Sequence, residues 1–154
     1  MKKYDSLNFI DFESLLTPDQ KEVRNSVRRF VDDEVLPLMQ EAYRNEIFPT
    51  KLIKRFGEQG LLGANLKGYG CAGIDTISYG LIMQEIERAD SGMRSFVSVQ
   101  GALCMYPIYV YGNEQQKEKY LPPMALGEMV GCFGLTEPDF GSNPGGMLTT
   151  ATET

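Results

Sequence analysis

The chain has 154 residues, of which 42% are hydrophobic and 23% charged, and its formal net charge is −6. These values are typical of one soluble globular domain without a membrane span, and the acidic balance argues against a nucleic-acid binder. The start of the chain resembles no signal or transit peptide, so we expect a cytoplasmic protein with a small-molecule partner. Histidine is absent, which argues against metal sites and histidine-based triads. Cys71, Cys104 and Cys132 are expected to be small buried hydrophobic residues.

The first clear helix is predicted to begin at Thr17. Thr17 is a typical N-cap, Pro18 suits the first helical position, and Gln20 completes a capping box. Valines at helical spacing then predict an amphipathic helix. Pro37 should end or kink it, and a shorter helix is expected to continue over residues 38–43.

A third helix is expected over residues 52–56, with Thr50 as its cap, and a glycine-rich segment follows. Residues 68–73 read Gly-Tyr-Gly-Cys-Ala-Gly, which matches the dinucleotide fingerprint Gly-x-Gly-x-x-Gly. That fingerprint needs a buried strand directly before it and a βαβ unit around it, and the sequence predicts neither. We therefore interpret the segment as a loop that joins two helices.

Helical patterns continue over residues 76–89 and, after a break at residues 90–92, over residues 93–111. The second of these helices is apolar on nearly all sides, which is typical of a central buried helix. Asn113 is expected to cap one more helix, which Pro122 and Pro123 should interrupt.

The pattern turns β-like only after Glu128, and a strand over residues 129–133 is followed by a turn. Gly141 and Ser142 in that turn would let backbone N–H groups and a hydroxyl approach a ligand oxygen. A single strand cannot satisfy its own backbone groups, so the sequence is expected to be a piece of a longer protein. The predicted fold is mainly α, with about six helices followed by one strand.

Four segments in this order, residues 17–20, 69–73, 85–95 and 131–142, resemble the acyl-CoA dehydrogenase family and, within it, the glutaryl-CoA dehydrogenases. The resemblance implies an N-terminal helical domain over residues 1–127 and the start of a middle β-barrel domain over residues 128–154. It implies FAD as cofactor, oxidation of glutaryl-CoA with decarboxylation to crotonyl-CoA, electron-transfer flavoprotein as partner and a homotetramer at full length.

The resemblance also implies site residues. Arg94 would meet the distal carboxylate of the glutaryl group, with Glu87, Ser95 and Ser142 in the same substrate site. A guanidinium suits that role because it stays charged and binds carboxylates in a bidentate fork. The family's catalytic glutamate belongs to its C-terminal domain, so no catalytic residue is expected in this chain. The flavin-binding residues would be Phe133, Gly134, Leu135, Thr136, Glu137, Pro138, Asp139, Phe140, Gly141 and Ser142.

Two alternatives to a glutaryl-CoA dehydrogenase stay open. The chain could belong to an acyl-CoA dehydrogenase for another acyl group, and Arg94 is the residue that discriminates between these substrates. It could also be a non-catalytic helical interaction module. In each case the chain alone is expected to be inactive, because a barrel and a bundle would supply most flavin and CoA contacts.

Overall fold

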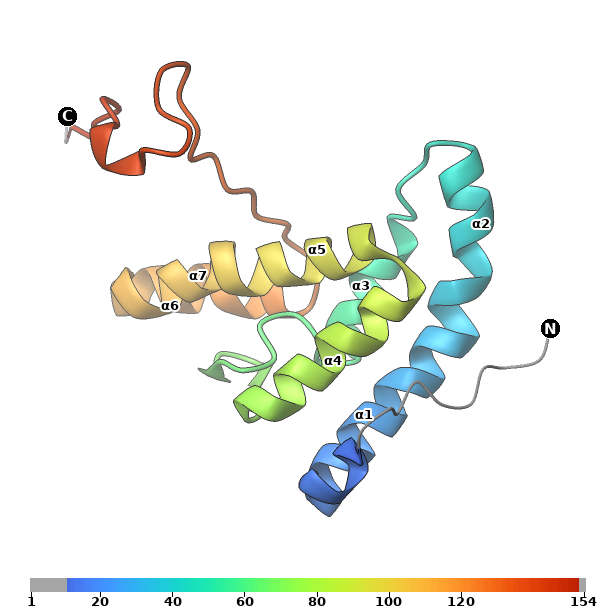
Figure 1. Ribbon diagram of the computed structural model, residues 1–154. Helices are drawn as coiled ribbons and strands as arrows, with labels where there is room; N and C mark the ends of the chain where they lie inside the picture. The colour runs from blue at the N-terminus through green and yellow to red at the C-terminus, as the bar shows by residue number, and fades with distance from the viewer. Residues whose placement is uncertain (1–10, 153–154) are drawn as a thin grey trace.

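The computed structural model describes residues 11–152, which are mainly helical, as predicted (Figure 1). Its elements in chain order are η1 (Phe12–Leu15), α1 (Pro18–Phe30), η2 (Val31–Val35), α2 (Leu36–Arg44), α3 (Lys51–Glu58), β1 (Lys67–Gly68), β2 (Cys71–Ala72), α4 (Thr76–Ala89), α5 (Ser91–Ser98), η3 (Val99–Met105), α6 (Tyr106–Tyr111), α7 (Glu114–Ala125) and η4 (Pro144–Gly146).

The start of α1 confirms the predicted capping box. The Gln20 N–H donates to Thr17 Oγ1 at 3.2 Å, and the Thr17 N–H donates to Gln20 Oε1 at 3.0 Å. Beyond α1 the helix continues through η2 into α2, with Pro37 in the first turn of α2. The segment η2 is a π-helix, whose wider turn relieves the clash between a proline ring and the preceding carbonyl groups. Pro37 therefore does not end the helix but lies in the first turn of α2, which covers the residues expected for the shorter helix.

The run formed by α5, η3 and α6 differs from the prediction of a helix buried on all sides. Val97 and Met105 are buried, but Leu103, Tyr106 and Val110 are 41%, 48% and 44% exposed. The run therefore packs by one face only, and its apolar second face is open in the described part of the chain. Its middle is again a π-helix followed by a proline in the first turn of the next helix.

Two local predictions were wrong. Pro122 and Pro123 do not interrupt α7, which continues to Ala125. Burial of Leu121 and Met124 at the same end holds this turn helical, as tertiary packing often overrides local preference. Thr50 precedes α3 but makes no side-chain capping bond, because its backbone is already helical at φ −53° and ψ −27°.

The glycine-rich segment joins α3 to α4, as predicted, and also forms a small hairpin that was not predicted. Strand β1 pairs antiparallel with β2, with Lys67 opposite Ala72. Tyr69 and Gly70 at its tip have φ of 52° and 81°, the left-handed pair that a two-residue hairpin turn of type I′ requires.

Helices α1 and α4 lie against each other, and α5 crosses near the end of α4 (Figure 1). Three aromatic rings connect α1 and α5 to α3. The ring centroids of Phe30 and Phe56 lie 5.8 Å apart, edge to face, and those of Phe56 and Phe96 lie 6.2 Å apart. Phe56 is completely buried, so these rings form the centre of the core.

A buried carboxylate joins α1 to α4. Glu85 is 1% exposed and accepts from Arg28 Nη2 at 2.7 Å, from Arg28 Nε at 3.1 Å and from Arg88 Nε at 3.0 Å. Arg88 also donates to Asp32 at 2.8 Å. Because a buried charge is tolerated only when it is paired and hydrogen-bonded, this network fixes how the two helices pack.

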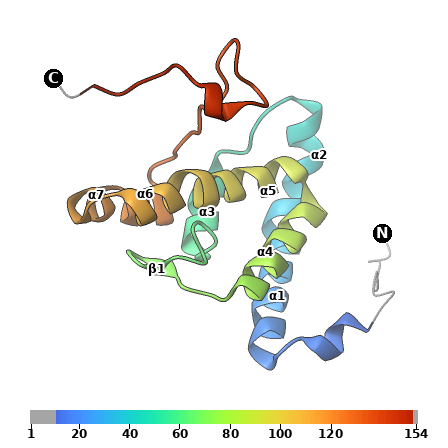
Figure 2. The same ribbon diagram turned by 60° about the vertical axis from the view of Figure 1, so that its left-hand side comes forward.

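After α7 the chain leaves the helices as an extended segment, drawn brown to red in Figures 1 and 2. The prediction of a strand over residues 129–133 was wrong: this stretch forms no strand, and within residues 11–152 the only later β contact is one bridge between Glu137 and Phe140. The sequence argument that a lone strand needs neighbours is consistent with this course. No helix in the described part is long and apolar enough to cross a membrane.

Candidate functional site

Glu87 and Arg94 meet across the corner between α4 and α5. Asp90 makes this corner: its extended backbone separates the helices, and its carboxylate accepts from the Met93 N–H at 2.9 Å as the N-cap of α5. Arg94 Nε then donates to Glu87 Oε2 at 2.6 Å, and Nη1 lies 3.4 Å from Ser98 Oγ. The structure thus brings together two of the predicted substrate residues.

The side chains of Arg94 and Glu87 are 36% and 47% exposed, so the ion pair is open to solvent on one side. Burial raises the pKa of the nearby Tyr79 phenol, and the Arg94 charge opposes that rise. Ser95 is half-buried, and its carbonyl accepts from Ser98 Oγ at 3.1 Å. Such a partly neutralised guanidinium can bind one more carboxylate, which would share or displace Glu87.

The first part of the predicted flavin segment presents unpaired backbone groups. The side chains of Phe133 and Leu135 are 48% and 39% exposed, and Thr136 is exposed as well. Within residues 11–152 no backbone N–H from Cys132 to Thr136 has a hydrogen-bond acceptor. Open N–H donors beside apolar side chains fit the polar edge and the flat face of a flavin ring.

The second part of the predicted flavin segment is a closed loop. Glu137 and Phe140 exchange backbone hydrogen bonds at 3.2 and 3.1 Å. The Glu137 carboxylate accepts from the Leu148 and Thr149 N–H groups at 2.9 and 2.8 Å, and these bonds, that from Leu148 first, hold its pKa below the usual range. Glu137 therefore closes this loop, whereas Gly141 stands in open space.

The structure does not join the two halves of the predicted site directly. No side-chain hydrogen bond or ion pair in the described part links residues 133–142 to Glu87, Arg94 or Ser95. They are connected through a residue that the sequence reasoning missed, Gln100, which lies on the same helical run as Arg94 and binds the Gly131 N–H. The available signal was a glutamine inside the otherwise apolar stretch of residues 99–105, since buried amides require hydrogen-bond partners.

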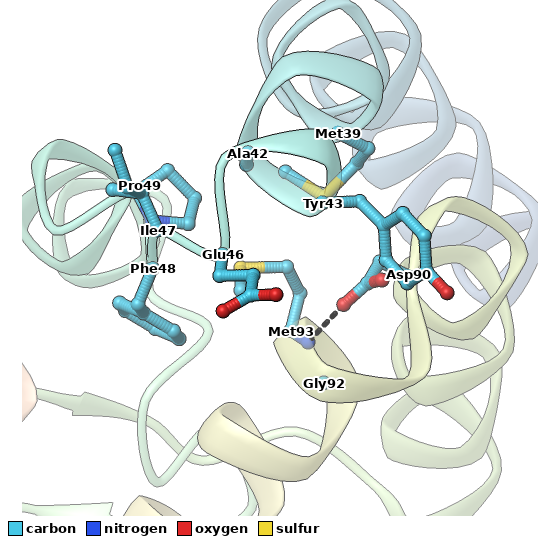
Figure 3. Close-up of a pocket in the computed structure, with 10 residues that line it drawn as sticks. All are labelled: Met39, Ala42, Tyr43, Glu46, Ile47, Phe48, Pro49, Asp90, Gly92 and Met93. Carbon is cyan, nitrogen blue, oxygen red and sulfur yellow. Dashed lines mark hydrogen bonds between the residues drawn. The ribbon is translucent and has the colours of Figure 1, made fainter.

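A separate hollow of about 380 Å³ lies between the α2–α3 corner and the start of α5 (Figure 3). Its lining is mainly apolar, with Met39, Tyr43 and Phe48, and its charged groups, Glu46 and Asp90, are both acidic. Such a lining does not favour an anionic ligand, so we do not assign this hollow to an acyl-CoA thioester.

The cysteines only partly match the expectation of buried residues. Cys104 is buried, Cys71 is half-buried and Cys132 is exposed. Burial raises the pKa of the Cys71 and Cys104 thiols, which suits an unreactive packing role for these two. Cys132 is exposed because it lies in the extended segment after α7.

Residues 17–128 match the family model described as acyl-CoA dehydrogenase, N-terminal domain. The chain therefore belongs to the acyl-CoA dehydrogenase family, as its sequence segments indicated. It spans about 36% of the length of the curated relatives that it matches.

Three similar proteins illustrate the range of the family. A glutaryl-CoA dehydrogenase from Mycobacterium smegmatis in complex with FADH2 is 52% identical with a TM-score of 0.86, over 89% of this chain and 36% of that chain. A short-chain specific acyl-CoA dehydrogenase from Clostridium acetobutylicum is 39% identical over 88% of this chain and 36% of its own length. A chain from a structure of the electron transferring flavoprotein of Acidaminococcus fermentans is 38% identical with a TM-score of 0.82, over 92% of this chain and 37% of that chain.

Proposed function

We propose that this chain forms the N-terminal helical part of an FAD-dependent glutaryl-CoA dehydrogenase, which oxidises glutaryl-CoA and decarboxylates the product to crotonyl-CoA. The observation that carries the proposal is Arg94, a half-exposed cation held by Glu87 and Ser98 at the corner of α4 and α5. A monocarboxylic acyl chain has no group for this cation, whereas the distal carboxylate of a glutaryl group is its natural partner. The 52% identity to the Mycobacterium smegmatis enzyme supports the same substrate.

The cofactor proposal rests on residues 133–136. Their open N–H groups and apolar side chains fit a flavin edge, and the similar Mycobacterium smegmatis enzyme is in complex with FADH2. A bound flavin would accept the hydride in the oxidation. The residues of this chain would orient the flavin edge and the substrate carboxylate, while the general base would come from another domain.

The decisive experiment uses a chimera in which residues 1–154 replace the matching N-terminal portion of the Mycobacterium smegmatis glutaryl-CoA dehydrogenase. Wild-type and Arg94→Met chimeras are assayed with glutaryl-CoA and butyryl-CoA, with an artificial electron acceptor. Loss of a charge-assisted contact, worth about 1.5–3 kcal/mol, should lower kcat/KM for glutaryl-CoA roughly 10- to 100-fold. The value for butyryl-CoA should change little, because its chain ends in a methyl group.

Arg29→Met serves as the matched control, because Arg29 is an exposed arginine on α1 whose side chain is 65% accessible. This control should leave kcat/KM unchanged for both substrates. An Arg94→Met chimera that keeps its preference for glutaryl-CoA over butyryl-CoA would refute the carboxylate assignment. It would favour the alternative of a dehydrogenase for another acyl-CoA, which the similarity to the short-chain specific enzyme also supports.

We further propose electron-transfer flavoprotein as the electron acceptor of the whole enzyme, and a homotetramer as its assembly. The similarity to a chain in the Acidaminococcus fermentans flavoprotein structure supports the first of these. Reduction of a purified electron-transfer flavoprotein by the chimera with glutaryl-CoA tests the electron acceptor. Light scattering gives the mass of the assembly.

The chain by itself should not hold FAD stoichiometrically, since residues 133–136 offer one exposed edge and no enclosing wall. Absorbance near 450 nm after purification with added FAD measures this directly. A stoichiometric yellow protein would show that the 154 residues already contain a complete flavin site. Oligomers without flavin would instead favour the interaction-module alternative.

A further inference from the structure

Gln100 is a buried polar side chain in the middle of an apolar helical run. It is the second residue of η3, it is 1% exposed, and its neighbours Val97 and Met105 are core residues. A primary amide in such surroundings is costly unless its donors and acceptor are satisfied.

Within residues 11–152, the hydrogen bonds of the Gln100 side chain all go to the backbone at the end of α7 and just beyond it. Nε2 donates to the Met124 carbonyl at 3.2 Å and to the Met129 carbonyl at 2.8 Å. Oε1 accepts from the Gly131 N–H at 2.9 Å. Both amide protons and the amide oxygen are thus used on one short stretch of chain, in a pattern that a carboxylate or an apolar side chain could not reproduce.

Close backbone packing fixes the same stretch. A Cβ at Gly131 would lie 2.7 Å from Cys104 Cβ and 2.9 Å from Met124 Cε, so the chain passes between these side chains with no room to spare. Gly127, at φ +70°, turns the chain against α3, where a Cβ would come within 2.5 Å of the Ile53 carbonyl oxygen. The course from α7 to Gly131 is therefore determined by side chains and backbone of the helical part.

Gln100 also ties this course to Arg94. The two residues lie six positions apart on one helical run, which corresponds to about 9 Å along its axis. Phe133 follows Gly131 by two residues, or at most about 7 Å of extended chain. We propose that Gln100 is a positioning residue, whose amide sets the point and direction at which residues 133–136 leave the helices relative to Arg94. The catalytic consequence of this rests on the proposed function, but the tether itself does not.

Hydrogen exchange on the wild-type chain tests the tether without any mutation. Resolved by NMR, the Gly131 N–H should exchange at least about tenfold more slowly than its unpaired neighbours Cys132 and Phe133, after correction for intrinsic rates. In Gln100→Met, which keeps the size and removes the hydrogen bonds, this protection should be lost while amides of α1 and α4 keep theirs. Equal rates for Gly131 and Phe133 in the wild type would overturn the inference.

The chimera tests the positioning role. Gln100→Met and Gln100→Glu should lower kcat for glutaryl-CoA and butyryl-CoA together by about 10- to 100-fold, with a smaller change in KM, because the flavin edge is displaced for both substrates. The spectrum of the bound flavin should shift as well. Gln115, an exposed residue on α7, gives the matched controls Gln115→Met and Gln115→Glu. These controls should change neither kcat nor the flavin spectrum.

The outcomes separate the two proposals. A wild-type chimera that oxidises butyryl-CoA but not glutaryl-CoA refutes the proposed substrate. The hydrogen bonds of Gln100 are then still tested by hydrogen exchange at Gly131. Gln100 variants that lose Gly131 protection but keep kcat within twofold and an unchanged flavin spectrum overturn the positioning role.

Discussion

Two neighbouring arginines on α1 allow a sharp test of the buried charge network. Arg28 donates two hydrogen bonds to Glu85, which is 1% exposed, whereas Arg29 lies 3.9 Å from Glu22 and both those side chains are more than 60% exposed. Arg28→Gln and Arg29→Gln remove the same charge from adjacent positions. A buried Glu85 carboxylate left without any partner would lower the free energy of unfolding by about 3–5 kcal/mol. The loss should be smaller here, because Arg28 is itself 46% exposed and Arg88 still pairs with Glu85. We therefore expect Arg28→Gln to cost about 1.5–3 kcal/mol and Arg29→Gln less than about 0.5 kcal/mol.

The measurement is urea unfolding of the 154-residue chain followed by far-UV circular dichroism. The midpoint should fall in Arg28→Gln with an unchanged m-value, and a double-mutant cycle with Glu85→Gln should show non-additivity of at least about 0.5 kcal/mol. If the two single variants shift the midpoint equally, or if the cycle is additive, Glu85 does not join α1 to α4 in the way described.

Two further perturbations address packing and pH. Gly57→Ala should destabilise the chain by about 2 kcal/mol or more, since its Cβ would lie 2.3 Å from the Leu126 carbonyl carbon, whereas Gly80→Ala on α4 has open space and should stabilise by about 0.5–1 kcal/mol. Thermal unfolding midpoints test this pair, and a Gly57→Ala midpoint at or above that of Gly80→Ala would contradict it. The pKa of Asp75 is lowered, first by the Ser78 hydroxyl, so its contribution is present above the unfolded pKa and is lost as pH falls through the folded one. Asp75→Asn should accordingly flatten the loss of stability below about pH 4 in acid titrations, and an unchanged acid slope would contradict the assignment.

The parts of the fold that the sequence predicts well depend on neighbouring residues. The capping box at Thr17 and the cap at Asn113 were predicted because each uses a side chain and an N–H three residues apart. The helical class followed from these signals and from apolar spacing.

The parts that the sequence did not predict depend on distant partners. The resemblance placed Glu87 and Arg94 in one site, but their ion pair requires the break at Asp90, which brings α5 back against α4. The polar tether of Gln100 depends on carbonyl groups 24 and 29 residues away, which no local pattern contains. The exposed face of α6 likewise looks buried in sequence, because composition gives apolar character and not the neighbours that cover it.

The helical run of α5, η3 and α6 explains how one element can serve both halves of the proposed site. Six residues at the α-helical 3.6 residues per turn change the side-chain direction by about 240°, and the two residues of η3 alter this only slightly, so Arg94 and Gln100 leave the run on different faces. Arg94 accordingly meets Glu87 on α4, while Gln100 meets the end of α7 and the chain beyond it. A rotation or shift of this run would move the Arg94 guanidinium and the start of residues 133–136 together. Under the proposed function, the distance between a bound carboxylate and a flavin edge would therefore be set by helix geometry, which is stiffer than the exposed segment proposed to contact the flavin.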